Sequence, residues 1–252
     1  MLKNHKYKGT LLLSPHSDDI VMSSFQIIKN EILPKPIHMV TIFSVSEYIL
    51  TPNDIHLTQK DITNIRLNED IEFCRKYGIS YHYFKFPDAG IRLGRAICDA
   101  CYPLDNKLIF DVRKQLSQLI YILKPKIIVC QYPYGHKQHI DHRTVFHALS
   151  DIVRSKIIRE INVYFLDDIP YSRIPLDTVL IWNNIYYVPK VFVVENVEEK
   201  YSAMNIYKSQ MCEEYFKGIK KTISKIKENE ITETLWVPVK HMAPERMRRD
   251  RK

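Results

Sequence analysis

The sequence predicts an α/β fold, and two observations support that prediction. Short apolar runs of strand length alternate with longer segments of helical periodicity, which is the pattern of repeated βαβ units. The apolar runs are continuous rather than alternating, as expected for parallel strands that are covered by helices on both faces. We therefore expect a Rossmann-like three-layer sandwich with a mostly parallel sheet.

Each predicted strand is a short apolar or β-branched run that stops at proline, glycine or polar residues. Lys126–Gln131 is the clearest case, because it is apolar almost throughout and a polar loop, Tyr132–His139, follows it. The predicted strands, in order, are Gly9–Pro15, Ile37–Val45, Tyr81–Phe86, Lys126–Gln131, Asn162–Leu166 and Val191–Glu195.

Each predicted helix places apolar side chains three or four residues apart, so that they share one face. The side chain of Ser17 or Asp18 would cap the first helix, and Gly78 would end the second. Two stretches of weak periodicity, Ile91–Asn106 and Asp167–Asn184, are expected to be loops at the rim of a pocket. The predicted helices are Ile20–Asn30, Asp61–Tyr77, Leu108–Leu123, Ile140–Val153, Val197–Cys212 and Tyr215–Lys227.

The composition excludes several classes of protein. With 45% hydrophobic and 26% charged residues, the chain is neither disordered, collagen-like nor of low complexity. No apolar run reaches the roughly 18 residues that a membrane span needs, and the apolar stretch near the N-terminus is too short for a signal peptide. We expect a cytoplasmic protein with a single domain over residues 1–252, which ends in a basic tail at residues 244–252.

Five cysteines, an odd and sparse count, argue against a disulfide framework. Cys98 and Cys101 form a C-x-x-C pair, and no second pair follows it. A structural zinc normally needs four ligands. An incidental loop pair is therefore the simplest interpretation, and a redox pair is the alternative.

The formal net charge of +8 allows attraction to phosphates, nucleic acid or an anionic membrane face. The basic residues are not grouped, however, except at residues 246–252, and the chain has only six glycines. A solvated basic surface is therefore favoured, and we expect no nucleic-acid partner. The charge also makes a phosphorylated, nucleotide-linked or lipid-linked small-molecule substrate attractive.

Two predicted loops carry unusual polar chemistry, and each follows a strand. The first is Pro15-His16-Ser17-Asp18-Asp19, and the second is Gly135-His136-Lys137-Gln138-His139-Ile140-Asp141-His142. In open α/β sheets, ligands bind outside the carboxyl ends of the strands. If the two strands are neighbours in the sheet, the two loops meet at one crevice.

The residue types in these loops are those of a catalytic zinc site. His16 and Asp19 are three residues apart at a junction between loop and helix, and His142 could reach the same point from the second loop. Two imidazoles and one carboxylate leave a further position open for water and substrate. We therefore predict His16, Asp19 and His142 as ligands of one Zn²⁺ per chain.

Three more residues have predicted catalytic roles. Asp18 lies beside the ligands without being needed as one, and its carboxylate could take a proton from a water whose pKa the metal lowers. His139 could stabilise an oxyanion or protonate a leaving amine. Asp141 could hold the ring of His139 in one tautomer.

Structural interpretations exist for each residue taken singly. An aspartate of the first loop could be only a helix N-cap, and a histidine of the second loop only a surface side chain. The two clusters together favour the metal site. The nearby His136 and His147 are more simply structural, and His136 is the better substitute ligand of the two.

These two clusters together resemble the motifs of the PIG-L/LmbE-like de-N-acetylases, although Ser17 stands where that family usually has proline. The family comprises zinc hydrolases that remove acetyl groups from N-acetylglucosamine-type sugars. The resemblance implies the ligand set and the catalytic roles given above, with Asp18 as general base. Weaker similarities extend it over residues 9 to 210, at Arg66-Leu67-Asn68-Glu69, Tyr77-Gly78-Ile79, Phe86-Pro87-Asp88 and Tyr207-Lys208-Ser209-Gln210.

The resemblance also implies that Arg66 and Asp88 contact the sugar or its substituent. From the residues alone, Arg66 could instead be an exposed helix arginine paired with Asp70, and Asp88 could be a turn residue. The sequence leaves both interpretations open.

The sequence thus predicts a metal-dependent amidohydrolase that removes the N-acetyl group from an N-acetylated amino sugar or its conjugate, by attack of metal-activated water on the acetamide. Another metal hydrolase, such as a phosphoesterase with two metals and more carboxylates, is an alternative. A non-enzymatic binder of anionic glycan or nucleic acid is a second alternative, and a degenerate sugar-binding pseudoenzyme is a third.

Overall fold

A computed structural model of the chain describes residues 8–50, 57–155, 160–211 and 231–239, and it confirms the predicted α/β fold. The strands of these residues form one eight-stranded sheet. In spatial order they are β3 (Ser80–Tyr83), β2 (Ile37–Thr41), β1 (Thr10–Ser14), β4 (Ile127–Gln131), β5 (Asn162–Leu166), β8 (Thr232–Val239), β7 (Ile185–Val193) and β6 (Leu180–Trp182).

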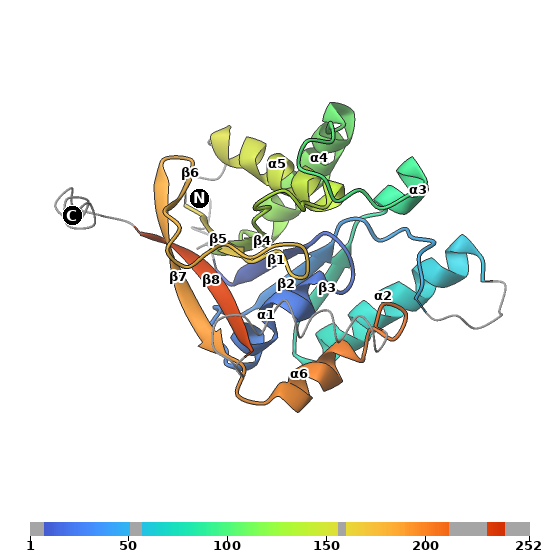
Figure 1. Cartoon of the computed structure of the whole chain (residues 1–252), viewed down its shortest axis with the longest axis horizontal. Coiled ribbons are helices and arrows are strands. Elements are labelled where there is room, and N and C mark those ends of the chain that lie inside the picture. Colours follow the sequence, from blue (N-terminus) through green and yellow to red (C-terminus); the bar gives the residue numbers. More distant parts are fainter. Residues whose placement is uncertain (1–7, 51–56, 156–159, 212–230, 240–252) are drawn as a thin grey trace, which may run out of the picture.

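Helices cover both faces of the sheet, as Figure 1 shows. One face carries α1 (Asp19–Lys29), α2 (Gln59–Lys76) and α6 (Val197–Met204), and the other carries α4 (Asn106–Leu123) and α5 (Ile140–Arg154). Alternate residues of β1 supply both cores: Leu12 packs on the first face, whereas Leu11 and Leu13 pack on the second. All three are fully buried, which explains why the strand is continuously apolar.

The strands from β3 to β5 are parallel, and the order of connection reverses between β1 and β4. The chain moves outward from β1 through β2 to β3, then returns to β4 and moves the other way to β5. Loops that leave the carboxyl ends of β1 and β4 therefore diverge to opposite sides and leave a crevice between them. The two polar loops found in the sequence follow these two strands.

The three antiparallel strands at the far end of the sheet were only partly predicted. Of these, the sequence analysis gave Val191–Glu195 alone and assigned Asp167–Asn184 to a loop, whereas β6 begins at Leu180. Strands β6 and β7 form a hairpin through Asn183 and Asn184, both of which have positive φ. Such two-residue turns strongly favour asparagine, so the Asn-Asn pair was a usable signal.

The predicted helices differ from the structure mainly at their ends. The helix predicted over Val197–Cys212 ends at Met204 and a turn follows it, while α2 starts at Gln59, two residues early, behind a capping box made by Thr58 and Asp61. A short helix, α3 (Ala89–Leu93), occupies the start of the predicted loop Ile91–Asn106. The helix predicted over residues 215–227 and the basic tail at 244–252 lie outside the described residues, and the single domain stays a prediction.

Helix α1 is broken at Ser24, which has non-helical dihedral angles (φ −148°, ψ 21°). Two side chains from distant segments bind the backbone groups near the break. Lys200 of α6 donates from Nζ to the carbonyl oxygen of Met22 (2.8 Å), and Glu233 of β8 accepts from the backbone N–H groups of Gln26 (2.8 Å) and Ile27 (3.2 Å). Lys200 and Glu233 also pair with each other at 2.6 Å, and each side chain is only 1% exposed. This buried ion pair therefore acts as an internal cap within α1.

We predict that Glu233→Gln lowers the free energy of unfolding by about 3 kcal/mol, because it leaves the Lys200 ammonium buried without a counter-charge. Urea denaturation of the wild type and the variant measures the effect. Glu199→Gln is the matched control, since the Lys29–Glu199 pair at the other end of α1 is about one-third exposed and should contribute under about 1 kcal/mol. Equal losses in the two variants would contradict the prediction.

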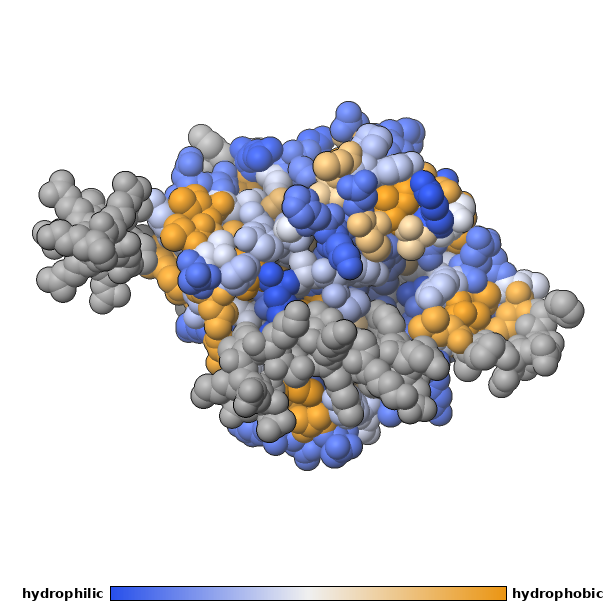
Figure 2. Space-filling model, viewed as in Figure 1, coloured by the Kyte–Doolittle hydropathy of each residue, from blue (hydrophilic) through white to orange (hydrophobic). Residues whose placement is uncertain are grey.

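The surface carries scattered apolar side chains (Figure 2). Over β6 and β7, at one edge of the sheet, Ile181, Ile185, Val191 and Val193 are exposed. Among the described residues, no helix combines the length and the hydropathy that a bilayer crossing requires.

Candidate active site

A pocket of about 460 Å³ opens at the carboxyl ends of β1 and β4. The first polar loop reaches it from β1, and the second reaches it from β4 at the start of α5. The expected meeting of the two loops is therefore what the structure shows. The lining residues are His16, Asp18, Asp19, Met22, Glu47, Tyr48, Leu50, Arg66, Asp88, Ala89, Gly90, Gly94, Arg95, Ala96, His139, Tyr171 and Gln210.

His16, Asp19 and His142 place three ligand atoms around one point. His16 Nδ1 lies 3.2 Å from His142 Nε2, and Asp19 Oδ2 lies 3.2 Å from His142 Nε2 and 3.5 Å from His16 Nδ1. Ligand atoms at about 2.0–2.1 Å from a tetrahedral zinc are roughly 3.3 Å apart, so this triangle has the size that one ion requires. The backbone N–H of His16 also donates to Asp19 Oδ2 at 2.7 Å, which fixes the carboxylate.

A second group of three shares two of these residues. Ligand atoms of His16, His139 and His142 lie within 4.8 Å of one another. His139 is the less suitable member, because its Nδ1 already accepts the backbone N–H of Asp141 at 3.2 Å as the N-cap of α5. Asp19 Oδ2 also accepts a backbone N–H, but a carboxylate oxygen keeps a second lone pair for a cation, and this oxygen lies closer to the other two atoms. The group that contains Asp19 therefore fits a metal better.

Each of the two histidines of the triangle has a carboxylate on its other ring nitrogen. Asp141 Oδ2 lies 2.9 Å from His16 Nε2, and Asp168 Oδ1 lies 2.6 Å from His142 Nδ1. The contact of Asp141 differs from the expected one, since its carboxylate binds His16 and only its backbone reaches His139. Asp141 also accepts from the backbone N–H of Ala89 at 2.9 Å and pairs with Arg92.

These contacts perturb the imidazole and carboxylate pKa values of the metal-free protein. Burial acts to lower the pKa of His16, but Asp141 and Asp19 outweigh it and raise the pKa to about 9. Burial lowers the pKa of His139 to about 3, with a contribution from the neighbouring His16 and His142. His139 is therefore neutral, and because its Nδ1 is an acceptor, its proton lies on Nε2.

Asp18 occupies the N-cap position of α1, yet its side chain makes no capping hydrogen bond. The sequence analysis expected Ser17 or Asp18 to cap this helix, and that expectation was wrong. Ser17 instead hydrogen-bonds Asp70. The carboxylate of Asp18 is buried and lines the pocket, where burial and the adjacent charge of Asp19 raise its pKa. The carboxylate therefore remains available for chemistry.

Arg66 and Asp88 both line the pocket. Arg66 is buried in the middle of α2 and donates from Nη1 to Ser46 Oγ at 2.7 Å, so the exposed pairing with Asp70 is excluded. Asp88 follows β3 and is the N-cap of α3, where its Oδ1 accepts from the backbone N–H of Ile91 at 3.0 Å.

The weaker motifs meet beneath the pocket. Glu69 on α2 accepts from both the backbone N–H (2.8 Å) and the hydroxyl (2.5 Å) of Ser209, and Gln210 donates to the carbonyl oxygen of Tyr48 at 3.1 Å. Two short motifs about 140 residues apart in the chain therefore form one wall. This contact explains why both motifs lie near the pocket although neither reaches His16, Asp19 or His142.

Four residues that the sequence analysis singled out do not line the pocket. His136 and His147 are exposed and do not line the pocket, as expected. Cys98 and Cys101 are exposed free thiols, and the backbone of Cys98 pairs with that of His139.

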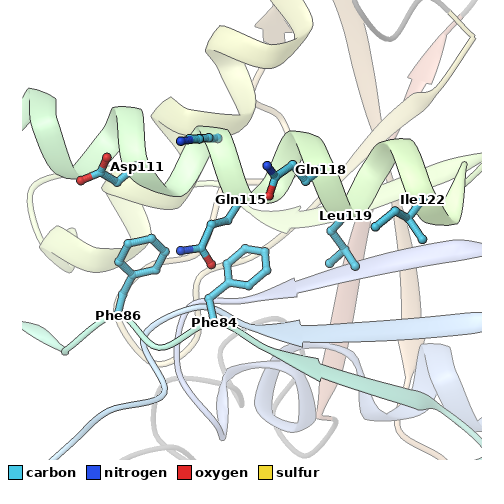
Figure 3. A pocket seen from close by; sticks show the side chains of 8 residues that line it. Phe84, Phe86, Asp111, Gln115, Gln118, Leu119 and Ile122 are labelled. Carbon is cyan, nitrogen blue, oxygen red and sulfur yellow. The ribbon is translucent and has the colours of Figure 1, made fainter.

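A larger groove of about 660 Å³ lies between α4 and β3, where Gln115 reaches toward Phe84 and Phe86 (Figure 3). No histidine lines that groove.

Asp168, Arg92 and Tyr171 belong to the site but were not predicted. Asp168 follows β5, the neighbour of β4, so its place at a carboxyl strand end was a usable signal. Arg92 and Tyr171 lie in stretches that the sequence left as loops. The ring of Tyr171 packs 5.3 Å from the centroid of His139 and 5.2 Å from that of His142.

Asp70 is fully buried beside the pocket and accepts from the hydroxyls of Thr41 (2.8 Å), Tyr81 (2.7 Å) and Tyr207 (3.2 Å). Burial raises its pKa to about 7, although these hydrogen bonds oppose the shift. An unfolded chain would lose the same proton near pH 4. Between these values the folded state binds more protons than the unfolded state, so stability falls as pH rises.

We predict that Asp70→Asn removes this part of the pH dependence. The free energy of unfolding of the wild type, relative to the variant, should fall by up to about 1.4 kcal/mol per pH unit between about pH 4 and pH 7. Urea denaturation at a series of pH values measures the difference. Asp111→Asn on the exposed face of α4 is the control, and a constant difference between wild type and Asp70→Asn would contradict the prediction.

Comparison with known proteins identifies the family. A family model described as GlcNAc-PI de-N-acetylase (PIG-L) matches residues 11–153, which is more than half of the chain. The chain belongs to this family, and the expectation of an amidohydrolase that acts on an N-acetyl amide bond is confirmed. A search of curated proteins found no match.

Solved structures with the same fold cover almost the whole chain. The deacetylase Dbv21 of the A40926 pseudoaglycone is 20% identical (TM-score 0.63, 94% of this chain and 100% of that one). The N,N'-diacetylchitobiose deacetylase of Pyrococcus horikoshii is 17% identical (TM-score 0.62, 93% and 86%). GalB of Pseudomonas putida, a 4-carboxy-2-hydroxymuconate hydratase, is 15% identical (TM-score 0.53, 93% and 97%). Identities this low establish the fold only, and the hydratase shows that this fold serves more than one reaction.

Proposed function

We propose that this protein is a zinc-dependent hydrolase that removes the acetyl group from an N-acetylated amino sugar. The observation that carries the proposal is the triangle of His16 Nδ1, Asp19 Oδ2 and His142 Nε2, with sides of 3.2 to 3.5 Å. These residues would hold one Zn²⁺. The ion would supply Lewis-acid polarisation of the acetamide carbonyl and would lower the pKa of a water molecule.

Asp18 is the proposed general base. It adjoins the ligand Asp19, lines the pocket and makes no capping hydrogen bond, so its carboxylate is free to accept the proton of the attacking water. The same carboxyl group, now protonated, can then act as the general acid and give that proton to the departing nitrogen. The free amine and acetate leave as products.

His139 is the proposed hydrogen-bond donor to the carbonyl oxygen as it becomes negative. Its Nδ1 accepts the backbone N–H of Asp141, so only Nε2 can carry the proton of the neutral ring. The ring lines the pocket, and its position is fixed by the start of α5. A donor fixed before the reaction stabilises developing charge without reorganisation.

Asp141 has a supporting role through His16 rather than through the side chain of His139. Its carboxylate orients His16, and Arg92 and the backbone of Ala89 hold the carboxylate in turn. Arg66 and Asp88 are the proposed contacts to the sugar hydroxyls or to a substituent, because both are buried and line the pocket.

The charges at the pocket favour an uncharged sugar conjugate over a phosphorylated or nucleotide-linked one. Acidic lining residues outnumber the basic ones, which are Arg66 and Arg95. The described residues carry as many acidic as basic side chains, so the excess positive charge of the chain belongs to segments outside them. The lining therefore provides no concentration of positive charge that would attract a phosphate.

Acetate release from a panel of N-acetylated sugars tests the proposal. The panel should include N-acetylglucosamine, its uncharged β-glycosides, N-acetylglucosamine 6-phosphate and a nucleotide-linked form. We expect hydrolysis of at least one uncharged member, loss of activity with a chelator, and recovery with one equivalent of Zn²⁺. Activity that survives chelation would refute the metal role, and a requirement for two metals with phosphate release would favour a phosphoesterase.

Asp18→Asn should bind zinc as the wild type does and lose activity by about 10²- to 10⁴-fold, because the amide cannot accept the proton of water. Zinc content by elemental analysis and acetate release measure the two effects. Asp88→Asn is a useful comparison, since Asp88 lines the same pocket and is not part of the proposed proton transfer. Full activity in a zinc-loaded Asp18→Asn protein would rule out Asp18 as the base.

Two variants separate the catalytic role of His139 from its role as a helix cap. Asparagine is a good N-cap, so His139→Asn should keep most of the stability, whereas His139→Ala should lose about 1 kcal/mol more. Both variants should lose about 10²- to 10³-fold in kcat, because the donor to the oxyanion is gone. Denaturation curves and kcat decide, and a His139→Asn protein with unchanged kcat would exclude the donor role.

A further inference from the structure

Asp168 is a buried carboxylate whose position neither the sequence motifs nor the proposed reaction explains. It follows β5, the neighbour of β4 in the sheet. Its Oδ1 lies 2.6 Å from Nδ1 of His142, and both side chains are fully buried. This is the shortest contact between a carboxylate and a ring nitrogen among the histidines of the site.

The contact fixes which nitrogen of His142 faces the metal site. A carboxylate can only accept, so the proton of the ring lies on Nδ1 and points to Asp168. The lone pair of Nε2 then points toward Asp19 Oδ2 and His16 Nδ1, each 3.2 Å away. His16 has the opposite arrangement, since Asp141 lies on its Nε2 and leaves Nδ1 for the metal.

The two carboxylates differ in how their charge is balanced. Asp141 pairs with Arg92 as well as with His16 and accepts a backbone N–H. Asp168 has His142 as its ion-pair partner, and its Oδ2 has no hydrogen-bond partner in the described part of the chain. A buried carboxylate is costly without a nearby positive charge. Among the ion pairs of the described residues, the ring of His142 is the one partner of Asp168.

We propose that Asp168 is the positioning residue for His142, holding its ring in the Nδ1-protonated tautomer and strengthening it as a metal ligand. The proposal rests on the proposed zinc site. A carboxylate behind a ligating imidazole raises the basicity of the ligand and fixes its orientation, and the loss of such a partner typically costs 10- to 100-fold in metal affinity. Asp168 is not among the residues that line the pocket.

Zinc affinity, measured by competition with a chromogenic chelator, tests the role. Asp168→Asn should lower the affinity for Zn²⁺ by about 10- to 100-fold, and Asp168→Ala should lower it at least as much. Asp167→Asn is the matched control, since the neighbouring Asp167 is equally buried but bonds the backbone of Ile174 (3.2 Å) and the indole of Trp236 (3.2 Å) instead of a ligand. It should reduce stability without a comparable loss of zinc affinity. Wild-type affinity in folded Asp168→Asn and Asp168→Ala would overturn the proposal.

Nitrogen-15 NMR of the histidine rings in the zinc-loaded wild type provides a test that does not depend on the folding of a variant. We expect the proton on Nδ1 of His142 and on Nε2 of His16, so the two ligands should show opposite tautomers. A proton on Nε2 of His142 would overturn the proposal. A wild type that takes up no zinc in the competition assay would instead overturn the proposed metal site, and with it this inference.

Discussion

The hydrogen-bonded pairing of β1 with β4 is the constraint on which the site depends. These strands are far apart in the chain but run parallel and in register, with Thr10 opposite Ile127 and Leu12 opposite Val129. Their carboxyl ends therefore lie side by side, and each leads into a loop that ends at a helix N-terminus. The distance between His16 and His142 is thus set by the sheet rather than by either loop. A site built on such a frame is held more precisely than one built on loops alone.

The molecule buries several charged side chains against side chains of opposite charge. Asp141 lies between His16 and Arg92, Lys200 lies against Glu233, and Asp168 lies against His142. Each of these pairs joins segments that are distant in sequence. An unpaired partner would be left charged in a medium that solvates it poorly, so the pairs penalise any packing that separates these segments. The charges then favour one arrangement of the chain, whatever their net contribution to stability.

Sequence reasoning succeeded where a residue type and a local pattern were enough. The continuous apolar runs gave the parallel strands, because burial on both faces leaves a strong signal in the residues themselves. The edge at β6 to β8 was largely missed because its signals are weaker. Strand β7 has partly exposed residues along most of its length, and β8 contains Glu233, whose burial makes sense only beside Lys200.

The same division applies to the site. The sequence was enough to predict that His16, Asp19 and His142 lie together, because each motif follows a predicted strand and ligands bind at the carboxyl ends of such strands. Which ring nitrogen each carboxylate contacts depends on the tertiary structure and cannot be predicted from the spacing of the residues. Asp141 is adjacent to His142 in the chain and two residues from His139, yet its side chain binds His16 across the crevice. Only the arrangement of α5 against the first loop reveals that contact.

The break in α1 also bears on the order in which the chain can become structured during its synthesis. The first half of this helix begins with the aspartates that line the pocket, while the second half takes its cap from a strand formed by residues 232–239. A ribosome delivers that strand after every other described helix and strand. The cap of the second half of α1 therefore cannot form until residues 232–239 have been synthesised, although the helix itself directly follows β1 in the chain.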